Sequence, residues 1–154
     1  MRTAQVGRGR GGFTLLEMLV VITIVAILGG MVVQAFGGVA SGIATRSSKE
    51  ALVTLQAVAR ARAVERGMTA KMILHVADGR AYVIQNDTVR RSINLLTEFG
   101  VTVSAESVDS LIVCMSPKGY ADLDCGSFST AITLVLTQGG STRVVTILPM
   151  GQIN

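Results

Sequence analysis

The stretch GRGRGGFTLLEMLVVITIVAILGG, residues 7–30, decides how this chain is organised. A glycine–arginine run ends at Gly12, and 21 residues follow from Phe13 to Val33 with Glu17 as their one charge. At about 1.5 Å per residue a helix of this length spans about 30 Å, the thickness of the hydrocarbon core of a bilayer. The stretch therefore predicts a retained membrane-spanning helix behind a basic leader.

The charge distribution supports this prediction and argues against a nucleic-acid partner. Hydrophobic residues make up 49% of the 154 residues and charged residues 16%, with a net charge of +4. Arg2, Arg8 and Arg10 all precede the apolar run, so the rest of the chain is close to neutral. The positive-inside rule places the N-terminus in the cytoplasm and the remainder outside it.

Two motifs in the leader are coincidental. Gly7, Gly9 and Gly12 match G-x-G-x-x-G, and RGRGG resembles part of an RNA-binding segment. A dinucleotide-binding motif must follow a strand and open a helix, and this one precedes a membrane span instead. We expect no bound cofactor and no nucleic acid here.

Gly12, Phe13 and Glu17, followed by MLVVITIVAIL, resemble the class III signal of type IV pilins and type II secretion pseudopilins. The resemblance implies that a prepilin peptidase cuts after Gly12 and methylates the new N-terminus, Phe13. It also implies assembly with other pseudopilins or minor pilins on a platform in the bacterial inner membrane.

Glu17 has a physical role in this interpretation. A carboxylate within a bilayer costs several kcal/mol unless it is paired, and the apolar run supplies no cation. By analogy with the family, Glu17 attracts the N-terminal amine of a neighbouring subunit and sets the register of assembly. The alternative is a glutamate that snorkels from a helix end to the interface.

The implied organisation has four parts. Residues 1–12 are a cleaved cytoplasmic leader, 13–36 the transmembrane part of the helix, 37–67 its periplasmic amphipathic part, and 68–154 a β-rich periplasmic domain. The glycines between residues 29 and 42 weaken a helix. They either let it bend or melt in the filament, or allow close packing against other helices.

The second half of the chain predicts an α+β fold. Residues 47–66 have Leu52, Leu55, Val58, Ala59 and Ala63 near helical spacing. Their arginines, Arg60, Arg62 and Arg66, do not share one face, which favours a solvated helix surface over a nucleic-acid patch. Short β-rich runs follow, at residues 69–76, 81–86, 101–105, 110–115, 131–137 and 142–148. Asp78-Gly79 and Gly139-Gly140 predict hairpin turns, and the long N-terminal helix should pack on antiparallel sheets as in type IV pilins.

The segments LQAVARARAVERG, SPKGYADLDC and ITLVLTQGGSTRVVTILPMGQI resemble the GspH/FimT group of minor pseudopilins and minor pilins. This implies a structural subunit of a type II secretion pseudopilus, near the tip of a periplasmic filament. The alternative is a type IV pilus minor pilin in pilus priming or DNA uptake. DNA uptake in that group uses a terminal GRxR motif, and this chain ends in GQIN, which lacks the cations that bind phosphate.

The sequence supplies no catalytic or metal site. His75 is the one histidine and has no paired ligands around it, and Asp122 and Asp124 alone make a weak calcium motif. Cys114 and Cys125 form an even pair in a part expected to face an oxidising compartment, which favours a disulfide over two buried thiols.

Overall fold

The computed structural model describes residues 13–106, 108–126 and 130–154. The chain divides into two compact units, Met1–Phe36 and Gly37–Asn154, and helix α1 (Leu15–Arg66) contributes residues to both. In the first unit the apolar side chains from Phe13 to Leu28 are exposed. Among the described residues, no helix is both long enough and apolar enough to cross a membrane.

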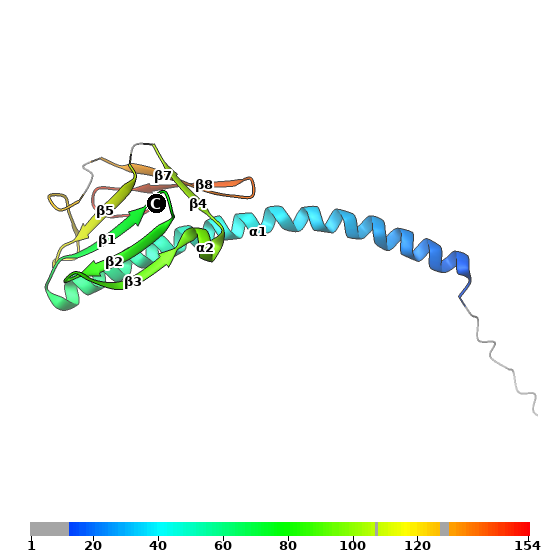
Figure 1. Cartoon of the computed structure of the whole chain (residues 1–154), viewed down its shortest axis with the longest axis horizontal. Helices are drawn as coiled ribbons and strands as arrows, with labels where there is room; N and C mark the ends of the chain where they lie inside the picture. Colours follow the sequence, from blue (N-terminus) through cyan, green and yellow to red (C-terminus); the bar gives the residue numbers. More distant parts are fainter. Residues whose placement is uncertain (1–12, 107, 127–129) are drawn as a thin grey trace, which may run out of the picture. The chain divides into compact units, whose positions relative to one another are not determined.

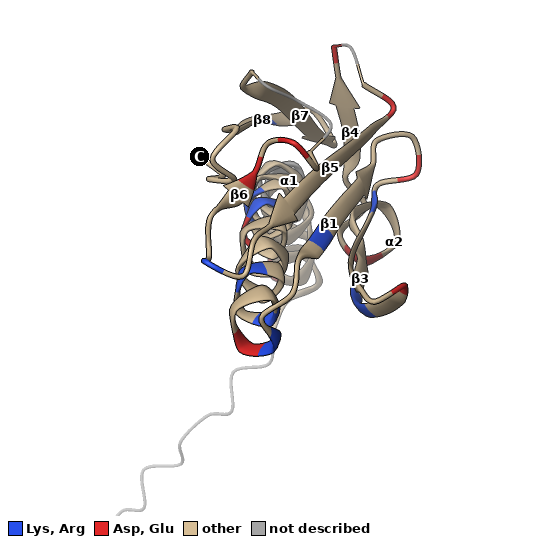
Figure 2. Ribbon diagram, turned by 90° about the vertical axis from the view of Figure 1, so that its left-hand side faces the viewer, with Lys and Arg blue, Asp and Glu red and all other residues tan. Residues whose placement is uncertain are grey.

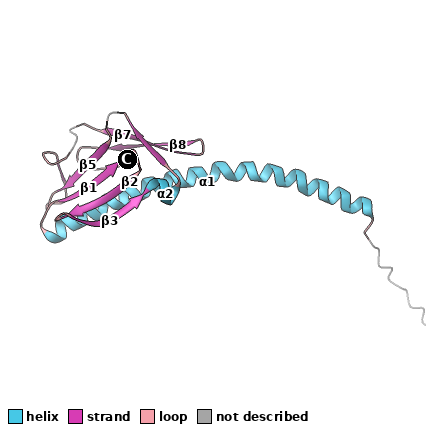
Figure 3. Ribbon diagram, in the orientation of Figure 1, coloured by secondary structure: helices cyan, strands magenta, loops and turns pink. Residues whose placement is uncertain are grey.

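The second unit contains two antiparallel sheets (Figure 3). The larger sheet has the strand order β3-β2-β1-β5-β6 and the smaller has the order β4-β7-β8. The strands of the larger sheet are β1 (Ala70–His75), β2 (Arg80–Gln85), β3 (Thr88–Asn94), β5 (Ser110–Met115) and β6 (Ala121–Asp122). Those of the smaller sheet are β4 (Thr102–Ala105), β7 (Ile132–Gln138) and β8 (Ser141–Ile147). The predicted fold class, a long N-terminal helix packed on antiparallel sheets, is confirmed.

Both predicted hairpins form. Asp78-Gly79 lies in the turn between β1 and β2, where His75 pairs with Arg80. Gly139 and Gly140 connect β7 to β8 with φ values of 52° and 84°. Positive φ at both central residues matches the twist of a two-residue hairpin, and glycine adopts it without steric strain.

The core joins one face of α1 to both sheets (Figure 1). Leu52, Leu55, Ala59 and Ala63 are buried, as the helical spacing predicted, whereas Val58 is only partly buried. Their partners in the core cluster that lie on the strands are Met72, Leu74, Val83, Leu111, Val113, Leu134, Leu136, Val145 and Ile147. Burial of this face holds the helix against the sheets because it removes apolar area from water.

Three elements were missed by the sequence prediction: strand β3, helix α2 and the two-residue strand β6. Strand β3 follows β2 through Asn86 and Asp87, which have φ values of 52° and 54° and form a second two-residue turn. Helix α2 (Leu95–Phe99) is capped by Asn94, whose Oδ1 accepts hydrogen bonds from the Leu96 and Thr97 backbone N–H groups at 3.0 Å. Gly100 closes it in the left-handed conformation.

The C-terminal residues fold back along β8. Thr146 and Asn154 exchange two backbone hydrogen bonds of 2.9 Å, and Ile147 forms a β-bridge with Ile153. Gly151 makes the turn with a φ of 77°. A Cβ at this position would lie 2.6 Å from Met115 Cε and 3.1 Å from Ala121 Cβ. The terminal GQIN therefore closes a sheet edge, and its glycine suits both the left-handed conformation and the restricted space.

We expect Gly151→Ala to lower the free energy of unfolding by about 2 kcal/mol, from left-handed strain and overpacking together. The measurement is urea unfolding of the purified full chain in detergent, followed by circular dichroism. Gly140→Ala is the matched control, because its φ of 84° is similar but its Cβ would meet nothing within 4 Å. Its cost should be strain alone, about 1 kcal/mol. Equal losses in the two variants would show that the packing around Gly151 relaxes freely.

Candidate functional site

The N-terminal site is described from Phe13 onward, and Gly12 lies outside the described residues. Phe13 is exposed and precedes Thr14, the residue before the first turn of α1. Glu17 lies in that first turn and is exposed. It has no ion pair with any residue that the structure describes. Its carboxylate is therefore available to a cation from elsewhere.

Thr14 caps the start of α1, which the sequence prediction did not include. Its Oγ1 accepts a hydrogen bond from the Glu17 backbone N–H at 3.2 Å. Thr14-Leu15-Leu16-Glu17 has the spacing of a capping box. In such a box the glutamate side chain also accepts a hydrogen bond from the backbone N–H of the capping residue. The first turn of a helix favours a negative charge as well. Glu17 thus has a local reason for its position beside its proposed role in assembly.

Cys114 and Cys125 are joined in a disulfide with their Cα atoms 5.8 Å apart. Cys114 lies on β5 and pairs in register with Asp122 of β6. Within the loop between the cysteines, the Ser116 side chain and backbone N–H both donate to the Tyr120 carbonyl oxygen at 2.9 Å. The disulfide and these bonds organise a surface loop that exposes Tyr120 and Leu123.

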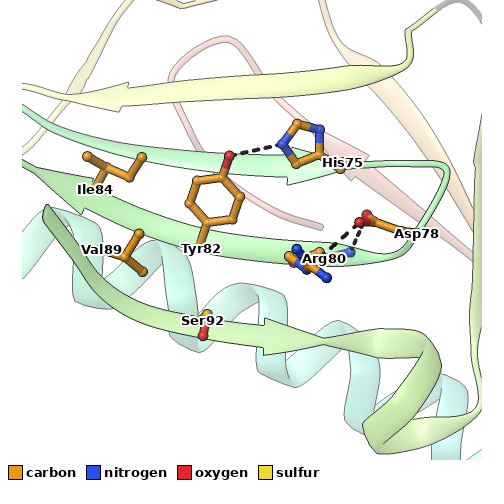
Figure 4. A pocket seen from close by; sticks show the side chains of 7 residues that line it. All are labelled: His75, Asp78, Arg80, Tyr82, Ile84, Val89 and Ser92. Carbon is orange, nitrogen blue, oxygen red and sulfur yellow. Dashed lines mark hydrogen bonds and ion pairs between the residues drawn. The ribbon is translucent and has the colours of Figure 1, made fainter. Parts of the chain in front are cut away.

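His75 lies at the end of β1 and contacts Tyr82 of β2 (Figure 4). Its Nε2 is 2.9 Å from Tyr82 Oη, and Arg80 Nε lies 3.8 Å from Asp78 Oδ2 beside them. These side chains line an open hollow of about 480 Å³ together with Ile84, Val89 and Ser92. The Tyr82 hydroxyl is the hydrogen-bond partner of the His75 side chain among the described residues, on the surface of the sheet.

The acidic residues of the cysteine loop do not gather into a metal site. Asp122 Oδ1 accepts a hydrogen bond from the Asp124 backbone N–H at 3.1 Å, which is a local turn interaction. Across the described part of the chain, no three histidine, cysteine, aspartate or glutamate residues lie together in a way that suits a metal ion.

The fold brings together arginines that are far apart in sequence. Arg60, Arg62 and Arg66 lie on α1 without sharing one face, but Arg90 and Arg91 of β3 lie opposite Arg62. These three line a cleft of about 310 Å³ with Val58, Ala61 and Glu65. Figure 2 shows basic residues both on this part of α1 and on β3. Sequence reasoning missed this cleft because its two walls, α1 and β3, are separated along the chain by the β1–β2 hairpin.

Comparison with known proteins identifies the N-terminal site. The family described as the prokaryotic N-terminal methylation motif matches residues 7–33. With the fold described above, this match confirms the resemblance to type IV pilin-like proteins seen in the sequence. No curated protein gave a significant match to the chain.

The fold is similar to that of the type IV minor pilin FimU of Pseudomonas aeruginosa. One crystal structure of FimU has a TM-score of 0.50 at 19% identity, covering 71% of this chain and 85% of FimU. A second crystal form has a TM-score of 0.49 at 20% identity, covering 71% and 90% of the two chains. At this level of identity the likeness concerns the fold.

Proposed function

We propose that the chain is a minor structural subunit of a filament of the type IV pilin class. The observation that carries the proposal is the methylation motif at residues 7–33 in a chain with a minor pilin fold. The work of such a subunit is mechanical, through contacts with its neighbours, and it requires no catalytic site.

In this proposal residues 1–12 are removed by a prepilin peptidase and residues 13–36 hold the subunit in the inner membrane until assembly. Membrane insertion rests on the sequence, in which the apolar run continues to Val33. Residues 37–154 then face the periplasm, where a disulfide between Cys114 and Cys125 is stable. The liberated amine of one subunit and Glu17 of another attract each other in a medium of low dielectric constant.

Two filament systems fit this role. The first is a type II secretion pseudopilus, in which the subunit lies near the tip and helps to drive protein secretion. The second is a type IV pilus, favoured by the similarity to a solved type IV minor pilin. Deleting the gene in its own host distinguishes the two systems. Loss of a pseudopilus subunit leaves secreted protein inside the cell, whereas loss of a pilus subunit removes surface pili.

Processing tests the proposal directly. Co-expressed with a prepilin peptidase, the chain should give a mature form that begins at methylated Phe13, measured by mass spectrometry. Gly12→Ala should leave most of the chain uncut, since the residue before the cut is altered. Gly11→Ala is the matched control and should be cut normally. Cleavage after the apolar run, near Gly38 or Ser41, would refute the proposal.

A further inference from the structure

The cleft between α1 and β3 has a fixed geometry. Gln85, which is 4% exposed, donates its Nε2 to the Arg62 carbonyl oxygen at 3.1 Å and to the Met68 carbonyl oxygen at 3.3 Å. These bonds tie the last turns of α1 and the residues just after it to the end of β2, from which the tight turn leads into β3. Both walls of the cleft are therefore held by the fold, in spite of their exposure to solvent.

A β-bulge places two consecutive arginines at this cleft. In the β2–β3 register Val83 pairs with Arg91 and Ile84 pairs with Val89, so Arg90 is the extra residue. Consecutive side chains of a regular strand point to opposite faces, whereas a bulge changes the direction of a side chain. Arg90 and Arg91 accordingly both line the cleft.

The charges of the cleft are unbalanced. Arg62 is 3.8 Å from Glu65 and its side chain is 43% exposed. The Arg90 and Arg91 side chains have neither an ion pair nor a hydrogen bond to any described residue. Three arginines and one glutamate thus line the cleft, together with Val58 and Ala61.

We propose that this arginine cleft binds an acidic segment of a partner protein through its glutamate or aspartate side chains. A guanidinium group donates two parallel hydrogen bonds to a carboxylate, and Arg90 and Arg91 have this capacity unused. The apolar lining residues Val58 and Ala61 suit the aliphatic part of a peptide.

An acidic peptide fits this cleft better than duplex DNA does. A duplex presents about one charge per 1.7 Å of its axis, so its binding surface must offer a long basic stripe. This cleft has a volume of about 310 Å³ and three arginines among its lining residues, which is too short for such a stripe. The proposal concerns a surface outside the N-terminal motif and stands whether or not the chain assembles into a filament.

The test measures binding of a fluorescein-labelled hexaglutamate peptide to the full chain in non-ionic detergent, by fluorescence anisotropy. Arg90→Gln/Arg91→Gln should weaken binding about fivefold, the effect expected for two partly exposed ion pairs. Arg62→Gln should weaken it independently. Wild-type binding should decrease as salt is added.

The matched control is Arg80→Gln/Arg143→Gln, which removes the same charge from exposed positions outside the cleft. It should change the affinity less than about twofold. Equal weakening in the two double variants, no hexaglutamate binding by the wild type, or tighter binding of a 12-base-pair duplex would each overturn the proposal. Aggregation of the Arg90/Arg91 variant with unchanged peptide binding would also overturn it, since the arginines would then protect an edge strand.

Discussion

Glu17→Gln is expected to lower incorporation of the subunit into filaments at least about tenfold, a change equivalent to about 1.4 kcal/mol. The neutral amide lacks the charge that attracts an N-terminal amine, and loss of one partner of a buried ion pair costs more than this. Glutamine still serves in a capping box, so the start of α1 should remain intact. The measurement is the amount of the subunit in purified filaments relative to the membrane pool, by immunoblot.

Two further variants separate assembly from helix capping. Glu17→Ala removes both the charge and the side-chain hydrogen-bond acceptor of the capping box. It should lower incorporation into filaments at least as much as Glu17→Gln does. Thr23→Ala is the control, because the Thr23 hydroxyl donates only to the Val20 carbonyl oxygen of its own helix among the described residues. If the glutamine variant assembles normally and the alanine variant does not, Glu17 acts as a helix cap and the register role is wrong.

Loss of the disulfide should lower the free energy of unfolding by about 3 kcal/mol, the chain-entropy estimate for a loop of this size. The cysteines are 11 residues apart, and the loop between them contains few buried side chains. Cys114→Ala/Cys125→Ala avoids placing a hydroxyl at the buried position of Cys114. Denaturant unfolding of the full chain in detergent measures the change.

Reduction of the wild-type chain is the control for this double variant. It breaks the cross-link but keeps both sulfur atoms, so any extra loss in the double variant comes from packing around Cys114. We expect the reduced chain to account for most of the effect. Identical unfolding midpoints for the oxidised and reduced chains would contradict the prediction.

The sequence by itself determined the features that depend on local order. Gly12, Phe13 and Glu17 stand at fixed spacing before an apolar run, and no tertiary contact is needed to recognise that motif. Leu52, Leu55, Ala59 and Ala63 lie on one helical face and are all buried, because a period near 3.6 leaves only one face for the core. Gly139-Gly140 predicted a hairpin because positive φ at two consecutive residues favours glycine.

Local signals for other elements were present but weak. Strand β3 has the sequence TVRRSIN, in which apolar and polar side chains do not alternate, and its first five residues are exposed. Helix α2 has only five residues, fewer than two turns, and its periodicity carries no information. The Asn86-Asp87 turn and the Asn94 cap were the signals that could have located them.

Only the tertiary structure decided which charges lie together. Arg62 is on a helix and Arg90 and Arg91 are on an edge strand, and the β1–β2 hairpin intervenes between them. Their proximity requires the buried Gln85 bonds to the end of α1 and the bulge that changes the direction of Arg90. A bulge depends on the register of two paired strands, and a register exists only once both strands have packed on the same core.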